Sequence, residues 1–125
     1  MKNVLVVDDS TTMRRMVISS LRGLNDVAFQ EAVNGLEAIE KLAVGSVALM
    51  ILDLNMPDMH GMEVIAFVRK HATFSELPII VLSTRGDDDS RTAALSAGAA
   101  LYFNKPFEPA ALAAGVRRLL FGDVQ

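Results

Sequence analysis

Short apolar runs rich in β-branched residues alternate along this chain with longer segments in which apolar residues recur every three to four positions. The first pattern is typical of strands buried on both faces, and the second is typical of amphipathic helices. Strands are predicted over residues 4–7, 27–32, 47–53, 79–82 and 100–103. Helices are predicted after each of them, over about residues 13–24, 36–44, 61–71, 90–97 and 109–120.

The alternation of strand and helix predicts an α/β fold in which helices cover both faces of a parallel sheet. The expected architecture is a (βα)5, flavodoxin-like doubly wound sheet. A common order for five parallel strands of this class is 2-1-3-4-5, with its switch point between strands 1 and 3. This order is carried over from known sheets and does not follow from the residues. Ligands of such sheets bind at the carboxyl ends of the strands.

The apolar positions of the first two helices predict which of their faces meet the sheet. In the first helix the arginines lie mostly off the apolar stripe, and in the second the apolar face is thin. The predicted inward residues are Met13, Met16, Val17, Leu21 and Leu24 in the first helix, and Leu36, Ile39 and Leu42 in the second. Gly23 and Asn25 are expected to stop the first helix, and Gly45 the second.

The composition is that of a folded, soluble domain. Its 125 residues suffice for one domain, expected to span residues 1–125, and 51% of them are apolar while 22% are charged. A net charge of −3 argues against a nucleic-acid surface, and the lack of cysteine excludes disulfides and thiol chemistry. The apolar run near the N-terminus is too short for a signal peptide or a membrane span, so a cytoplasmic location is expected.

Acidic residues follow two of the predicted strands. Asp8 and Asp9 come directly after the first strand, and Asp53 ends the third. In the order 2-1-3-4-5 these strands are neighbours, about 4.8 Å apart, so the carboxylates converge beside the switch point. They would repel one another, and a hard divalent cation would relieve that repulsion. Mg²⁺ is favoured over a caged Ca²⁺, because few protein ligands leave room for water and a phosphate oxygen.

Hydroxyls and a lysine follow two further strands. Ser83 and Thr84 end the fourth strand, and Lys105 comes after the fifth. Lysine is a mobile cation suited to phosphate, so carboxylates, a hydroxyl and a lysine at four strand ends predict a phosphoryl-transfer site. Asp53 alone could equally cap a helix or face water. The acidic run at residues 87–89 is interpreted as a capping turn at a helix start rather than a metal site.

These residues belong to longer motifs. In chain order they are Val-Val-Asp8-Asp9-Ser10, Asp53-Leu-Asn55-Met-Pro57-Asp-Met-His-Gly61, Leu82-Ser83-Thr84 and Lys105-Pro106-Phe107. In order and spacing the sequence resembles a response-regulator receiver domain from end to end. Within that family it is most similar to the chemotaxis regulators, on the motifs Thr11-Thr12-Met13-Arg14-Arg15 and Asn55-Met56-Pro57.

The resemblance implies a protein of a two-component phosphorelay. Asp53 is then expected to accept a phosphoryl group from a histidine kinase, with Lys105 paired to Asp53 or to its phosphate. The Lys105-Pro106 peptide bond is expected to be cis. The implied ligands of Mg²⁺ are Asp9, Asp53 and the backbone carbonyl of Asn55, with Asp8 acting through a water molecule.

The resemblance also implies a switch. Ser83 is expected to move towards the phosphoryl group, and Tyr102 to turn inward behind it. This would change the face formed by the fourth helix, the fifth strand and the fifth helix. Asn55, Thr84 and Arg85 are expected to tune hydrolysis of the phosphoryl group.

The implied partners follow from the same resemblance. They are a histidine kinase, an output protein that binds the switched face, and a phosphatase, with neither nucleic acid nor membrane among them. The protein is expected to be a monomer that catalyses only its own phosphorylation and dephosphorylation. Chemotaxis or motility is the expected setting.

The sequence departs from the usual family pattern in three ways. His60 stands where aspartate is usual before Gly61, which weakens a helix cap and leaves the chemistry intact. Thr84 stands where alanine is common, so access for a hydrolytic water is expected to be narrower. Residues 99 and 100 are both alanine, where transcription factors of the family usually carry an acidic pair used in dimerisation. This difference favours a stand-alone role.

An enzyme of another class is the main alternative. A haloacid-dehalogenase-like, Mg²⁺-dependent phosphohydrolase also has an aspartate nucleophile after a strand, but it needs a second aspartate where this chain has Asn55, and usually a cap domain. A flavodoxin-like electron carrier needs a Ser-, Thr- and Gly-rich phosphate loop where Asp8 and Asp9 would repel FMN phosphate. A degenerate receiver is disfavoured because the acidic residues, the hydroxyl and the lysine are all present.

Overall fold

A parallel sheet of five strands forms the centre of the protein. The computed structural model describes residues 1–55, 61–84 and 87–122. The strands are β1 (Lys2–Val7), β2 (Val27–Ala32), β3 (Val47–Asp53), β4 (Ile79–Ser83) and β5 (Leu101–Asn104). They pair in the order β2-β1-β3-β4-β5, which confirms the predicted strand order and the doubly wound α/β class.

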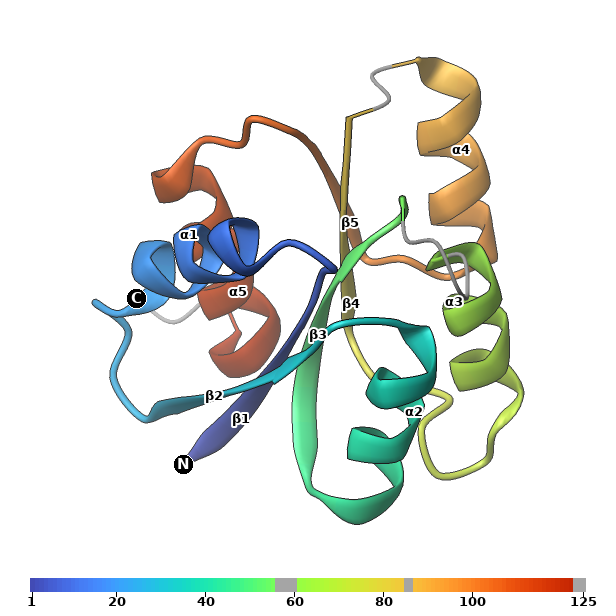
Figure 1. Cartoon of the computed structure of the whole chain (residues 1–125), viewed down its shortest axis with the longest axis horizontal. Helices are drawn as coiled ribbons and strands as arrows, with labels where there is room; N and C mark the ends of the chain where they lie inside the picture. Colours follow the sequence, from blue (N-terminus) through green and yellow to red (C-terminus); the bar gives the residue numbers. More distant parts are fainter. Residues whose placement is uncertain (56–60, 85–86, 123–125) are drawn as a thin grey trace.

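Helices cover both faces of this sheet (Figure 1). In the described part of the chain they are α1 (Thr11–Leu21), α2 (Gly35–Val44), α3 (Gly61–Lys70), α4 (Asp88–Ala97) and α5 (Pro109–Phe121). Helices α1 and α5 lie on one face, and α2, α3 and α4 lie on the other. None of these described helices is long and apolar enough to cross a bilayer.

Each central strand supplies side chains to two separate apolar cores. Leu5 and Val7 pack on the side of α2, α3 and α4, whereas Val4 and Val6 pack on the side of α1 and α5. The alternation follows from the two-residue period of a strand. Because both faces are covered, β1, β3 and β4 each contain a continuous apolar run, over residues 4–7, 47–52 and 79–82.

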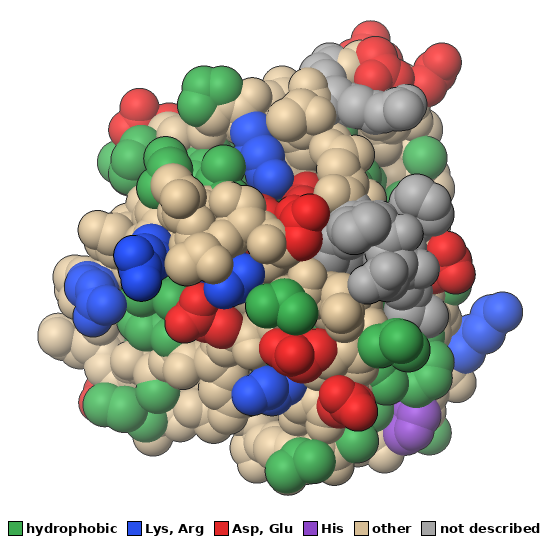
Figure 2. Space-filling view, in the orientation of Figure 1, with side chains coloured by type: hydrophobic (Ala, Val, Ile, Leu, Met, Phe, Trp, Pro, Cys, Tyr) green, Lys and Arg blue, Asp and Glu red, His purple; other side chains and the backbone are tan. Residues whose placement is uncertain are grey.

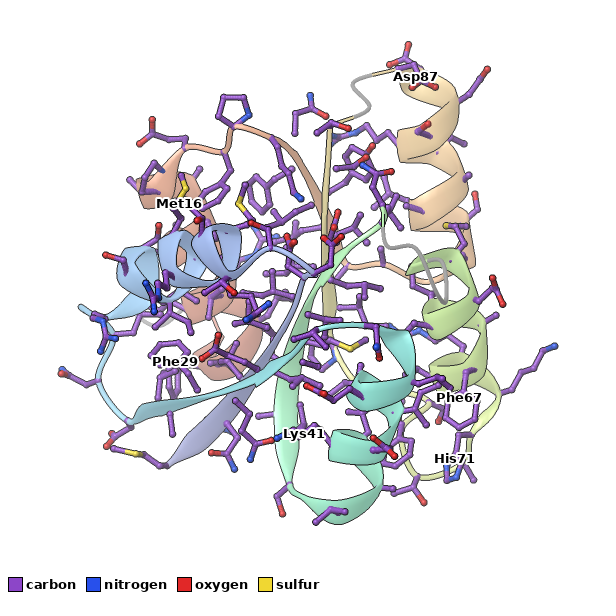
Figure 3. All side chains as sticks on the ribbon, in the orientation of Figure 1. Met16, Phe29, Lys41, Phe67, His71 and Asp87 are labelled. Atoms are coloured by element: carbon purple, nitrogen blue, oxygen red, sulfur yellow. The ribbon has the colours of Figure 1, made fainter. Side chains whose placement is uncertain are left out.

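Polar side chains fix the first turns of three helices. Ser10 Oγ and Asn34 Oδ1 each accept a hydrogen bond from the N–H three residues later, at 3.2 and 2.8 Å. Asp87 stands at the start of α4, where its Oδ2 accepts a hydrogen bond from the Ser90 N–H at 3.0 Å (Figure 3). The acidic run that begins there is a capping turn, as the sequence predicts.

The predicted inward faces of α1 and α2 are partly wrong. Met16 is 47% exposed (Figure 3), and Leu36 is also exposed, although the apolar stripes predict both to face the sheet. The buried residues of α1 are Arg14, Val17, Ile18 and Leu21. Helical spacing alone does not fix the rotation of a helix about its axis. For α1 the rotation is set by packing and by hydrogen bonds of the Arg14 side chain, which is 8% exposed as a residue.

Three strands differ from their predicted bounds, and β1 begins at Lys2, two residues before its predicted start. β4 includes Ser83, and β5 runs from Leu101 to Asn104 rather than from residue 100 to 103. Helix α1 ends at Leu21, where the Leu24 N–H bonds to the Leu21 carbonyl and the chain turns. The extension of β4 places the Ser83 hydroxyl on the last position of a central strand.

The charges on the surface are mixed. On the face that Figure 2 shows, the acidic and basic side chains of the described residues are interspersed. No broad basic region of the kind that nucleic-acid binding requires is seen among them there.

Candidate functional site

The carboxylates predicted to converge do meet at the carboxyl ends of β1 and β3. Asp8 follows β1 directly, Asp53 is the last residue of β3, and these strands are paired in register through Val7 and Leu52. One carboxylate oxygen from each of Asp8, Asp9 and Asp53 lies within 4.8 Å of the others. Asp8 and Asp53 are 3% exposed, whereas Asp9 faces solvent. The cluster is therefore buried on one side and open on the other.

Lys105 joins the two buried carboxylates. Its Nζ lies 3.1 Å from Asp8 Oδ2 and 3.0 Å from Asp53 Oδ1. The lysine backbone is also fixed, because the Lys105 N–H donates to the Ser83 carbonyl at 2.7 Å. The bond to Pro106 is cis, as expected. Side chains from three strand ends thus form one site.

Backbone N–H groups orient both buried carboxylates. Asp8 Oδ1 accepts a hydrogen bond from the Ser10 N–H at 2.9 Å, and Asp53 Oδ1 accepts one from the Asn55 N–H at 3.0 Å. In each case the donor lies two residues later in the chain, as in an Asx turn. The short segment after each strand therefore holds its own carboxylate in place.

Burial and neighbouring charges shift the pKa values of Asp8 and Lys105. Burial raises the pKa of Asp8, and the charge of Asp53 raises it further, against the lowering effects of the Ser10 N–H and of Lys105. Burial alone would lower the pKa of Lys105, but the hydrogen bonds and charges of Asp53 and Asp8 outweigh it and raise that pKa. Asp8 therefore binds its proton more tightly mainly because it is buried, and Lys105 does so because two carboxylates surround it.

These residues fit a hard divalent cation. Three carboxylates and one lysine leave two uncompensated negative charges when all are ionised, and all the acidic ligand atoms are oxygens. Oxygen ligands from few protein groups, with an open side for water, suit Mg²⁺. The predicted acidic cluster is thus present with the chemistry that a metal site needs.

The remaining predicted residues surround this cluster. Ser83 is fully buried at the end of β4. The side-chain amide of Asn55 donates from Nδ2 to Thr84 Oγ1 at 3.0 Å, so two residues expected to tune hydrolysis are in contact on the open side. Arg85, the third of them, lies outside the described residues, as do Pro57 and His60.

Tyr102 lies on β5 with its side chain directed inward. It is 5% exposed and belongs to the core on the side of α3 and α4. The resemblance implies that Tyr102 turns inward on phosphorylation, and this movement stays a prediction. Arg91 of α4 donates from Nη1 to the Tyr102 carbonyl at 3.4 Å, and its guanidinium carbon lies 5.8 Å from the ring centroid.

Sequence reasoning missed one buried contact of the site. The Arg14 guanidinium donates to the Asp8 carbonyl at 2.7 Å and to Glu31 at 2.8 Å. The helical pattern places Arg14 among exposed arginines, and Glu31 lies in a strand without any marking motif. The only signal in the sequence was the position of Arg14 at the edge of the apolar stripe of the first helix.

Fold and site together define a doubly wound α/β protein with an acidic cluster and a lysine at its switch point. Residues 4–117 match the family described as response regulator receiver domain. The chain belongs to this family. It is therefore a CheY-like receiver of a two-component signalling system, a class that transduces signals between histidine kinases and output proteins.

Individual relatives agree with this assignment. The chain is 43% identical to the chemotaxis protein CheY1 of Helicobacter pylori over 110 residues, which cover 87% of this chain and 89% of that protein. A CheY homologue of Campylobacter jejuni is 40% identical, over 87% of this chain and 85% of its own.

Solved structures share the fold. A putative response regulator from Chloroflexus aurantiacus superposes with a TM-score of 0.89 at 33% identity, over 95% of this chain and 97% of that one. The chemotaxis protein CheY4 of Vibrio cholerae superposes with a TM-score of 0.86 at 32% identity, over 96% and 99% of the two chains.

Proposed function

We propose that Asp53 accepts a phosphoryl group from the phosphohistidine of a histidine kinase, and that the modified protein signals to an output partner. The observation that carries this proposal is the position of Asp53, buried at the end of β3 with Lys105 Nζ 3.0 Å from its Oδ1. Burying a carboxylate beside other carboxylates is costly unless a cation or hydrogen-bond donors compensate its charge. Here both the lysine and the open side of the cluster suit a phosphoryl group.

The transfer is a displacement at phosphorus. A carboxylate oxygen of Asp53 forms the new bond, and the bond from phosphorus to the histidine nitrogen breaks in line with it. The electron pair of that bond returns to the imidazole, which leaves. Lys105 remains within reach of the added oxygens and stabilises their charge. The Asn55 N–H keeps the Asp53 carboxyl group oriented during the reaction.

The cofactor proposed for this site is Mg²⁺. Asp9, Asp53 and the backbone carbonyl of Asn55 would hold it, with Asp8 acting through a water molecule. When bound, it neutralises charge on the phosphoryl oxygens. The cluster that would hold it has a net negative charge and an open side, which supports this assignment.

The proposed signal passes through Ser83 and Tyr102 to the face formed by α4, β5 and α5. Ser83 lies at the end of β4, and its carbonyl is bonded to the Lys105 N–H. We assign Asn55, Thr84 and Arg85 to tuning hydrolysis. The proposed partners are a histidine kinase, an output protein at that face and a phosphatase. We further propose that residues 1–125 form a single receiver domain that acts as a cytoplasmic monomer and catalyses only its own modification and its reversal.

The alternative function, that of a phosphohydrolase, requires an acid/base group at the position of Asn55. Asn55 occupies the position where that class needs a second aspartate, and its side-chain amide donates to Thr84 Oγ1 at 3.0 Å. An amide does not transfer a proton to a leaving group at neutral pH.

Acetyl phosphate with Mg²⁺ tests the proposal directly. We expect intact-mass spectrometry to show one added phosphoryl group in the wild type and none in Asp53→Asn, because the nucleophilic carboxylate is gone. Because asparagine is isosteric with aspartate, a loss of labelling in this variant reflects the missing carboxylate and not a change of shape. Equal labelling of both proteins would rule out Asp53 as the acceptor.

A further inference from the structure

Arg14 is a buried arginine on the first turn of α1 that the proposed phosphoryl transfer does not use. Each of its guanidinium nitrogens donates a hydrogen bond. The acceptors are the Asp8 carbonyl for Nη1 at 2.7 Å, Glu31 Oε1 for Nε at 2.8 Å and Thr11 Oγ1 for Nη2 at 3.1 Å. The guanidinium therefore connects α1 to the end of β1 and to β2.

The Asp8 carbonyl is the backbone group that sets the direction of the next residue, Asp9. The Asp8 N–H continues the sheet by bonding to the Ala32 carbonyl at 3.1 Å. Its Oδ1 accepts from the Ser10 N–H, and its carbonyl accepts from Arg14. The C=O of Asp8 and the N–H of Asp9 belong to one planar peptide unit, so a bond to the first fixes the orientation of the second.

We propose that Arg14 is a positioning residue of the cation site. By holding the Asp8–Asp9 peptide, it keeps the Asp9 carboxylate directed at Asp53. Glu31 holds the guanidinium in turn, and because its side chain is 47% exposed, it balances the buried charge from the surface of the protein. This inference rests on the proposed function, which assigns Mg²⁺ to these carboxylates.

Three roles of Arg14 predict three different results. Positioning predicts that loss of the guanidinium weakens Mg²⁺ binding. A role through charge alone predicts the opposite sign, because removing a positive charge near carboxylates favours a cation. A role in folding alone predicts a lower melting temperature with an unchanged Mg²⁺ affinity. The affinity therefore separates the three.

The experiment is a calorimetric Mg²⁺ titration of the wild type, Arg14→Met, Arg14→Lys and Arg15→Met, well below their melting temperatures. Arg15 is the matched control, because it is the next residue of α1, is exposed and carries the same charge. We expect Arg14→Met to raise the Kd for Mg²⁺ about tenfold, at the lower end of the effect of groups that orient metal ligands. Arg14→Lys should raise it roughly threefold, since an ammonium cannot reproduce the fork of a guanidinium.

The control should change the Kd by less than about twofold, as expected for an exposed charge in salt. Equal Kd values for Arg14→Met and Arg15→Met, or tighter binding by Arg14→Met, overturn the positioning role while the site itself stands. If Arg14→Met does not fold, Arg14→Lys decides, and an unchanged Kd in that variant refutes the inference. A wild type that binds no Mg²⁺ overturns the proposed function, and the positioning role with it.

Discussion

Lys105 pairs with two buried carboxylates at once, so one positive charge faces two negative charges. Its Nζ lies within 3.1 Å of both Asp8 and Asp53. The pKa of Asp8 is raised by burial first and by Asp53 second, so its ionised form is held at a cost. Breaking a buried pair is usually destabilising, but removing a surplus buried charge has the opposite effect.

We expect Asp8→Asn to stabilise the metal-free fold at pH 7, by on the order of 1 kcal/mol. The pKa of Asp8 in the folded protein lies above its ordinary value of 3.8. Ionisation of Asp8 therefore costs stability at pH values above 3.8, and the full cost applies above the folded pKa. The gain should shrink as the pH falls through the folded pKa and vanish below 3.8, where wild-type Asp8 is itself protonated. Urea unfolding with a chelator at several pH values measures this.

A destabilised Asp8→Asn at pH 7 would contradict the prediction. It would mean that the bonds of Asp8 to Ser10 and Lys105 contribute more than its burial costs. Comparison with Asp9→Asn provides the control, because Asp9 is exposed and its removal relieves no burial.

The contact between Asn55 and Thr84 leads to a second prediction about single residues. Thr84→Ala should speed dephosphorylation of phosphorylated Asp53, because Asn55 Nδ2 loses its acceptor and the open side becomes less obstructed for water. A hydrogen bond worth about 1 kcal/mol corresponds to roughly a fivefold change in rate. Loss of the phosphoryl group over time, followed by mass spectrometry, gives the rate. Thr84→Ser keeps the hydroxyl and should match the wild type; an unchanged rate in Thr84→Ala would exclude this role.

At the scale of elements, the start of α3 packs unusually close to the end of β3. A Cβ on Gly61 would lie 2.7 Å from the Leu54 Cα and 3.0 Å from the Asp53 carbonyl oxygen. Both are backbone atoms, one of the proposed acceptor residue and one of the residue after it, so they cannot move aside cheaply. Glycine at this position lets the helix approach the site.

Gly61→Ala should therefore destabilise the fold by about 1–3 kcal/mol, as overpacking in a tight core does. Gly23→Ala is the matched control, because a Cβ there meets nothing within 4 Å. Urea unfolding of the two variants measures the difference. Equal stabilities would show that α3 can shift without cost. The close packing of α3 on the end of β3 would then not require glycine at position 61.

At the scale of the molecule, two contacts with backbone carbonyls join elements through which the proposed signal would pass. The Lys105 N–H bonds to the Ser83 carbonyl and so ties the loop after β5 to the end of β4. Ser83 lies in the chain just before α4, and Tyr102 on β5 contacts Arg91 of that helix. The proposed switch would pass a displacement at the end of β4 to α4 and β5 through these contacts.

Beryllofluoride, a phosphoryl analogue, should shift the amide resonances of Arg91 and Tyr102 as well as those near Asp53. In Ser83→Ala the shifts near Asp53 should persist, while those at α4 and β5 should fall by about half or more, because the hydroxyl contact that distinguishes the two states is gone. Ser83→Thr retains the hydroxyl and is the control. Shifts confined to the surroundings of Asp53 in the wild type would place the output surface elsewhere.

The sequence by itself determined the order of elements and the chemistry of the site. Continuous apolar runs identify strands buried on both faces, and polar residues at their ends identify what must meet at one edge of a parallel sheet. Asp8, Asp9, Asp53 and Lys105 were predictable as strand-end residues for that reason. That Asp8 and Asp9 meet Asp53 also needed the strand order of known sheets, which makes β1 and β3 neighbours.

Only the tertiary structure decided which way each helix faces. Met16 and Leu36 are exposed and Arg14 is buried, because the rotation of a helix depends on contacts with segments distant in sequence. For α1, one such contact is the bond from Arg14 to Glu31 of β2. The bond between Asn55 and Thr84 likewise joins loops after different strands. Local periodicity contains no information on such contacts, which form only when the sheet brings the loops together.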